Sequence, residues 1–181
     1  MSGHGQSYWP PLVNNYKSME LTHGEIETFV TLYKKIISNQ RAEVRIAATR
    51  LVDADNRISS VDSLLDAMIG LEALLNPSNN PELSFRVALN YASLRSSADR
   101  RNGYENIRAI YKTRSKIVHG DVKILSTKAA LIHEHAELAK QCLRYAINRF
   151  LFDDAFAGTT KLEDAFWEDR VIPPPLVPTL N

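Results

Sequence analysis

The scarcity of proline in the body of the chain is the strongest constraint on its fold. Four of the eight prolines lie in the last nine of the 181 residues, and only Pro77 and Pro81 fall between residues 12 and 172. Proline breaks helices because it lacks an amide hydrogen and its ring clashes with the preceding turn. Apolar residues recur at helical spacing in several segments, whereas no segment alternates as a strand does. The sequence therefore predicts an all-α bundle of about five to seven helices.

The predicted helices are marked by apolar stripes and by residues that start or end helices. Thr22 and Glu25 have the spacing of a capping box, at the start of one long helix or two in sequence over 22–52. Gly120 is placed to end a helix in the left-handed conformation. Ser126 or Thr127 should open the last long helix. The other stripes are Leu64, Met68, Leu71 and Leu75 after a Ser60 cap; Leu83, Val87, Tyr91 and Leu94 after Asn80 and Pro81; and Ile107, Ile110, Tyr111 and Val118 in a helix from about Tyr104.

The length fits one domain with extensions at both ends. Residues 1–21 show no helical period and are predicted to be an extended lead-in or linker, and residues 22–157 the helical bundle. Residues 158–181 combine a capping box at Thr160 and Glu163 with a proline-rich tail, which indicates a short helix followed by extended chain. The lead-in and tail resemble linkers, so we expect an upstream domain or partner subunit beside this chain.

Composition narrows the classes of function. The chain is 44% hydrophobic and 24% charged, as globular proteins are, and has no apolar run long enough for a signal peptide or a membrane span. Its single cysteine, Cys142, cannot form an internal disulfide, and no cysteine–histidine set has the spacing of a zinc site. These features predict a cytoplasmic protein without metal or cofactor.

Charge is unevenly distributed although the formal net charge is only +1. The segment 95–128 holds nine basic residues against three acidic ones, and the segment 150–170 holds six acidic against two basic. A local cationic excess either forms an anion-binding surface or is an ordinary solvated helix face.

The sequence RSKIVHG at 114–120 lies within the cationic segment. Arg114 follows Ile107 by seven residues and Tyr111 by three, which places it on the apolar stripe of its helix. Glu72 holds a matching position, four residues after Met68. Because an arginine is rarely buried without a partner, we expect an inward-facing Glu72–Arg114 ion pair. This pair could be purely structural.

His119 gives the motif a second interpretation. If the helix ends at Val118 and Gly120 turns the chain, the imidazole can fold back toward Arg114. A histidine that titrates near neutrality beside a fixed cation suits phosphodiester cleavage, in which the histidine moves protons and the arginine holds the phosphate. His133 and His135 lie two residues apart, so they cannot share one metal as an i, i+4 pair could, and we expect them at the surface or core edge.

Three segments extend this interpretation: DSLLDAMIGLEALL at 62–75, ELSFRVALNYASLR at 82–95 and IRAIYKTRSKIVHG at 107–120. Together they resemble HEPN domains, in particular the Apea-like branch, over about residues 22–150. HEPN domains are small helical bundles, usually dimeric, and many are metal-independent ribonucleases of antiviral or toxin systems. Their signature is an arginine followed, after four to six residues, by a histidine.

The resemblance implies roles for individual residues. Arg114 and His119 match the signature with four residues between them, and Glu72 matches the family's acid on the second helix. Active members often carry asparagine, aspartate or histidine after the arginine, where this chain has Ser115, which can support the site by hydrogen bonding but carries no charge.

The leading prediction is therefore a metal-independent endoribonuclease that cleaves RNA by attack of the 2′-hydroxyl, in a defence or stress system. RNA would be attracted by cations spaced four apart: Arg108, Lys112 and Lys116. We also expect a homodimer in which two RSKIVHG segments face each other, because a lone His119 supplies one proton-transfer group where the reaction gains from two. The alternative is a non-catalytic module for dimerisation or for binding RNA or protein.

Overall fold

The fold was analysed in a computed structural model that describes residues 21–39, 41–75, 83–121, 124 and 127–153. Within these residues the chain is all-α, as predicted, with six α-helices, one short 3-10 helix and no strand. None of the described helices combines the length and the apolar character that crossing a membrane requires. The elements are α1 (His23–Ser38), α2 (Ala42–Asn56), α3 (Ser60–Leu75), α4 (Leu83–Ser93), η1 (Ser97–Asp99), α5 (Arg100–Val118) and α7 (Ala129–Phe152).

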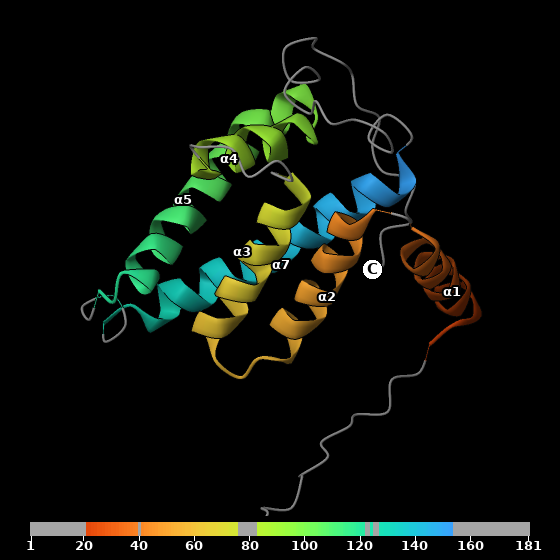
Figure 1. The fold of residues 1–181 in the computed structure, drawn as a ribbon, viewed down its shortest axis with the longest axis horizontal. Coiled ribbons are helices and arrows are strands. Elements are labelled where there is room, and N and C mark those ends of the chain that lie inside the picture. The colour runs from red at the N-terminus through yellow and green to blue at the C-terminus, as the bar shows by residue number, and fades with distance from the viewer. Residues whose placement is uncertain (1–20, 40, 76–82, 122–123, 125–126, 154–181) are drawn as a thin grey trace, which may run out of the picture.

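Helix α3 forms the centre of the bundle, between α2 and α7 and against α4 (Figure 1). The predicted stripe on α3 is fully buried, and each of these side chains contributes about 1.5–3 kcal/mol of apolar burial. Gly70 allows α7 to approach closely, because a Cβ atom at this position would lie 2.7 Å from Leu143 Cδ2. The stripe comprises Leu64, Met68, Leu71 and Leu75.

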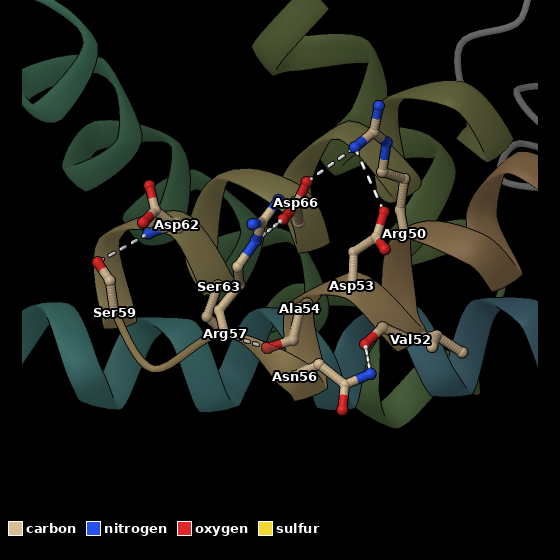
Figure 2. A network of polar contacts seen from close by, with 10 residues as sticks. All are labelled: Arg50, Val52, Asp53, Ala54, Asn56, Arg57, Ser59, Asp62, Ser63 and Asp66. Atoms are coloured by element: carbon tan, nitrogen blue, oxygen red, sulfur yellow. Dashed lines mark hydrogen bonds and ion pairs between the residues drawn. The ribbon is translucent and has the colours of Figure 1, made fainter. Parts of the chain in front are cut away.

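An ion network joins α2 to α3 (Figure 2). The nearly buried carboxylate of Asp66 lies 2.9 Å from Arg50 Nη1 and 2.7 Å from Arg57 Nε. Nearby, the Ser63 hydroxyl donates a 2.8 Å hydrogen bond to the carbonyl of Ala54. A carboxylate with two arginine partners satisfies its lone pairs, so the network can fix how α2 crosses α3.

Helices α4 and α5 pack against each other and flank the central layer (Figure 1). The Asn90 side chain on α4 donates a 2.7 Å hydrogen bond to the carbonyl of Leu75, which satisfies a free acceptor at the end of α3. Helix α5 begins at Arg100 rather than near Tyr104. Gly103 lets its first turn lie close to Arg95, since a Cβ atom at this position would be 3.1 Å from Arg95 Cγ.

Several helix boundaries differ from the prediction by a few residues. Helix α2 runs on through Asp53–Asn56, where a break was expected. Ser60 lies inside α3, and the Ser59 hydroxyl accepts the Asp62 amide instead. Helix α7 begins at Ala129, with Lys128 rather than Thr127 in the N-cap position. The predicted caps at Ser126, at Asn80 with Pro81, and at Thr160 with Glu163 lie outside the described residues, as does the predicted bundle end at residue 157.

Helix α1 lies apart from the central layer, beside the end of α7 (Figure 1). The predicted capping box is present, since the Thr22 amide lies 2.7 Å from Glu25 Oε2 and the Glu25 amide lies 3.4 Å from the Thr22 hydroxyl. The segment 22–52 is thus two helices in sequence. No residue of α1 is buried. The apolar residues that recur at helical spacing face outward rather than into the core: Ile26, Phe29, Val30, Tyr33 and Ile37.

Candidate functional site

The candidate site occupies the last two turns of α5. The helix ends at Val118, and Gly120 adopts the predicted left-handed conformation with φ of 70°. The Gly120 amide donates to the Ile117 carbonyl at 3.0 Å and the Asp121 amide donates to the Lys116 carbonyl at 2.9 Å, which is a Schellman motif. A glycine is required there because an L side chain is strained at positive φ.

Glu72 and Arg114 form the predicted ion pair between α3 and α5. Glu72 Oε1 lies 3.4 Å from Arg114 Nη2, and the two side chains are only 18% and 27% exposed. Arg114 Nε is buried and has no hydrogen-bond partner among the described residues. The pair therefore orients the guanidinium between α3 and α5.

Tyr111 is a third member of this cluster. Its hydroxyl donates a 2.8 Å hydrogen bond to the same Glu72 oxygen that faces Arg114, and its ring centroid lies 5.9 Å from the guanidinium carbon. Burial, together with the negative charge of Glu72, raises the pKa of Tyr111 above its ordinary value, so the hydroxyl stays protonated and can donate. Sequence reasoning placed Tyr111 in the core only. The missed signal was the hydroxyl group itself: a buried tyrosine one turn before Arg114 needs a hydrogen-bond partner, whereas a phenylalanine there would not.

An open groove of about 670 Å³ lies between α4 and α5, with Arg114 on its wall. Two of the three predicted RNA-binding cations, Arg108 and Lys112, line the groove together with Ser115, and both cations are solvent-exposed. Lys116 is exposed on the same helix but does not line the groove. The groove thus presents three cationic side chains and the hydroxyl groups of Ser84 and Ser115 to a ligand. Its other lining residues are Leu83, Ala109 and Tyr111.

His119 is exposed at the end of α5 and does not line this groove. Its backbone amide donates to the Ser115 carbonyl at 3.0 Å, while its side chain has no hydrogen bond or ion pair with any described residue. The structure thus brings Glu72, Arg114 and Ser115 together and leaves the imidazole in solvent, free to meet a ligand or a second molecule. Val118, predicted to point inward, is 56% exposed because Ile117 occupies the core side of the last turn.

His133 and His135 lie at the surface or core edge, as predicted. The exposed His133 Nδ1 lies 3.2 Å from the Ser60 hydroxyl, and His135 Nδ1 lies 2.8 Å from the Thr113 hydroxyl. Burial lowers the pKa of His135 and favours its neutral form. The contact with Thr113 joins α7 to the helix that carries Arg114.

The described residues contain no cluster of metal-ligating side chains, and the single cysteine is buried. No three histidine, cysteine or carboxylate side chains come together there as a metal site would need. Cys142 is buried, as expected, and burial raises the pKa of its thiol, which disfavours the reactive thiolate.

Comparison with known proteins adds no relative: the chain matches no family model, no curated protein and no solved structure. The geometry defines a cationic groove on an all-α bundle.

Proposed function

We propose that this protein is a metal-independent endoribonuclease of the HEPN type that binds single-stranded RNA along the α4–α5 groove. The observation that carries the proposal is Arg114, which Glu72 holds on the groove wall. Guanidinium groups bind phosphate oxygens through several parallel hydrogen bonds. Arg108 and Lys112 in the same groove would attract neighbouring phosphates.

The reaction assigned to this site is transesterification. A base removes the proton of the ribose 2′-hydroxyl, and the 2′-oxygen attacks phosphorus. The bond from phosphorus to the 5′-oxygen then breaks, a 2′,3′-cyclic phosphate forms, and an acid protonates the departing oxygen. His119 would supply one of these proton transfers, Arg114 would stabilise the charge on the phosphate, and Ser115 would donate a hydrogen bond.

A homodimer would complete the reaction. Since His119 is exposed at the tip of α5 and does not line the groove, a two-fold axis near that tip would bring a second Arg114 and His119 to the same RNA. One histidine would then act as base and the other as acid. The groove itself could bind RNA in a monomer.

Labelled single-stranded RNA incubated in EDTA tests the proposal. We expect the wild-type protein to cleave, His119→Ala and Arg114→Ala to lose cleavage, and His133→Ala, which alters an exposed histidine of α7, to retain it. Cleavage that requires a metal, or that survives in His119→Ala, would contradict the mechanism.

The second candidate is a non-catalytic RNA-binding module, and the observation that favours it is the absence of His119 from the groove lining. Under this alternative RNA binds with the wild-type affinity in His119→Ala, and no protein variant cleaves it. Anisotropy measurements on the same RNA separate the two candidates, and a protein that neither binds nor cleaves would rule out both.

A further inference from the structure

Helix α1 carries an apolar stripe that the rest of the described chain leaves uncovered. Phe29 and Ile37 are each 60% exposed and Tyr33 is 55% exposed, whereas the half-buried Leu32 and Ile36 form the edge that packs on the core. A cluster of large exposed side chains on one helix face is typical of an interaction surface. The exposed stripe comprises Ile26, Phe29, Val30, Tyr33 and Ile37.

Contacts on the other side of α1 hold the helix against the bundle. Lys35 Nζ donates a 3.2 Å hydrogen bond to the carbonyl of Leu151 and lies 4.6 Å from the centre of the Phe152 ring. These contacts fix α1 at the end of α7, so the stripe keeps a defined direction. Within the stripe, the rings of Phe29 and Tyr33 stack with centroids 6.2 Å apart.

The spacing and charges of α1 indicate what covers the stripe. Successive apolar residues of the stripe are separated by four, three and four positions, at Ile26, Val30, Tyr33 and Ile37. This is the spacing of a coiled-coil seam. Glu27 lies on one flank of this seam in the first half of the helix, and Lys34 lies on the same flank in the second half. Lys34 has no side-chain partner in the described structure, and Glu27 contacts only the exposed His23, at 3.3 Å.

We propose that α1 pairs in antiparallel orientation with α1 of a second copy of this chain. An antiparallel pair places each Glu27 beside the partner's Lys34, twice by symmetry, whereas a parallel pair would set Glu27 and Lys34 on opposite sides of the seam from the partner's copies and leave this charge pair unmade. The pairing buries five large apolar side chains from each copy. Helix α1 lies on the opposite side of the bundle from the tip of α5 (Figure 1), so this interface does not depend on the proposed function.

A charge-exchange experiment tests the pairing. Light scattering across micromolar concentrations measures the mass of the wild-type chain, of Glu27→Lys, of Lys34→Glu, of their equimolar mixture and of the double variant. Each single variant sets like charges against each other across the pair, so we expect its self-association to weaken by about tenfold or more. In the mixture and in the double variant opposite charges meet again, and the wild-type mass should return.

Tyr33→Glu provides a second test, because it places a carboxylate in the middle of the seam without disturbing the core. We expect it to abolish the association through α1, and so to lower the mass by the same step as the single charge variants, while circular dichroism keeps the wild-type helix content. The pairing is wrong if the wild-type chain gains no mass at the highest concentration, or if the single charge variants keep the wild-type mass. A loss that neither the mixture nor the double variant restores would also overturn it. RNA binding, measured in parallel, reports on the groove alone because no groove residue is altered.

Discussion

The hydroxyl of Tyr111 donates its hydrogen bond to the same Glu72 oxygen that faces Arg114, at 2.8 Å from Tyr111 and 3.4 Å from Arg114. The carboxylate therefore has one neutral and one charged partner on a single oxygen. Tyr111 limits how Glu72 can turn, and Glu72 in turn sets the position of the guanidinium on the groove wall.

Tyr111→Phe should weaken RNA binding while leaving the fold intact. The substitution keeps the buried ring and removes only the hydrogen bond to Glu72, which costs about 1 kcal/mol of unfolding free energy. With Glu72 less constrained, Arg114 should hold phosphate less well and the dissociation constant for RNA should rise. Tyr104→Phe is the matched control, because the Tyr104 hydroxyl has no hydrogen bond to any described residue. Equal effects from both variants would show that Tyr111 does not position the site.

The Glu72–Arg114 ion pair should show coupling in a double-mutant cycle. The pair is partly exposed, so Glu72→Gln should lower the free energy of unfolding by roughly 1–2 kcal/mol, less than a fully buried pair would lose. In the Arg114→Ala background, Glu72→Gln should lower the free energy of unfolding by less, because no arginine charge remains to be left unpaired. Urea denaturation of the four proteins measures this, and strictly additive losses would mean that the two side chains do not interact.

Lys112 should contribute one phosphate contact to RNA binding. Lys112→Ala should then reduce the slope of log affinity against log salt by about 0.7, the value expected for each phosphate neutralised on a single strand. Arg45→Ala, an exposed cation on α2, should leave the slope unchanged. A fluorescence titration at several salt concentrations provides the comparison, and a steeper or equal slope in Lys112→Ala would place the RNA elsewhere.

Gly70→Ala should destabilise the bundle because the added methyl group would lie 2.7 Å from Leu143 Cδ2 and 3.2 Å from Arg50 Cβ. Overpacking of this kind costs about 1–3 kcal/mol, which exceeds the gain in helix propensity of roughly 1 kcal/mol. Gly24→Ala is the control, since its added methyl group would meet no atom of another segment within 4 Å and only the propensity gain applies. Thermal unfolding should therefore shift in opposite directions for the two variants.

Stability should fall below neutral pH through His135. Burial lowers its pKa in the folded protein, whereas in the unfolded chain the imidazole takes up a proton near its ordinary pKa of about 6.5. The unfolded state then binds more protons, so the contribution of His135 is complete above that pKa and is lost as the pH falls through it. Urea denaturation at neutral and acidic pH should show a smaller loss for His135→Gln than for the wild type. His133→Gln, on the same helix, should keep the wild-type loss.

The ion pair at the site could be predicted from sequence because Glu72 and Arg114 each stand at the margin of a strong apolar stripe. Which side chains of the last turn of α5 face the core could not be predicted from sequence. Val118 fits the stripe of α5 by spacing, yet the last turns of α5 lie against α7, where Thr113 contacts His135. Ile117 therefore faces the core, and Val118, about 100° further round the helix, faces solvent.

Helix α1 shows a second limit of sequence patterns. Its stripe of Ile26, Val30 and Tyr33 has the same spacing as the buried stripes of the central helices, so periodicity predicts the helix and its apolar face equally well. Periodicity does not reveal whether that face meets the same chain or another one. The signals that favour a second copy are Glu27 and Lys34, which lie on one flank of the stripe. Among the described residues Lys34 has no side-chain partner and Glu27 contacts only His23.

Because no residue of α1 is buried, its amide hydrogens should exchange at a different rate from those of the central helices. Segments with few buried contacts exchange their amide hydrogens through small local openings, whereas central segments exchange only when the whole domain unfolds. The amides of α1 should therefore exchange with solvent deuterium well before those of α3. If two copies pair through α1, mass action protects only the paired form, so α1 should exchange more slowly as the protein concentration rises, while α3 keeps a constant rate.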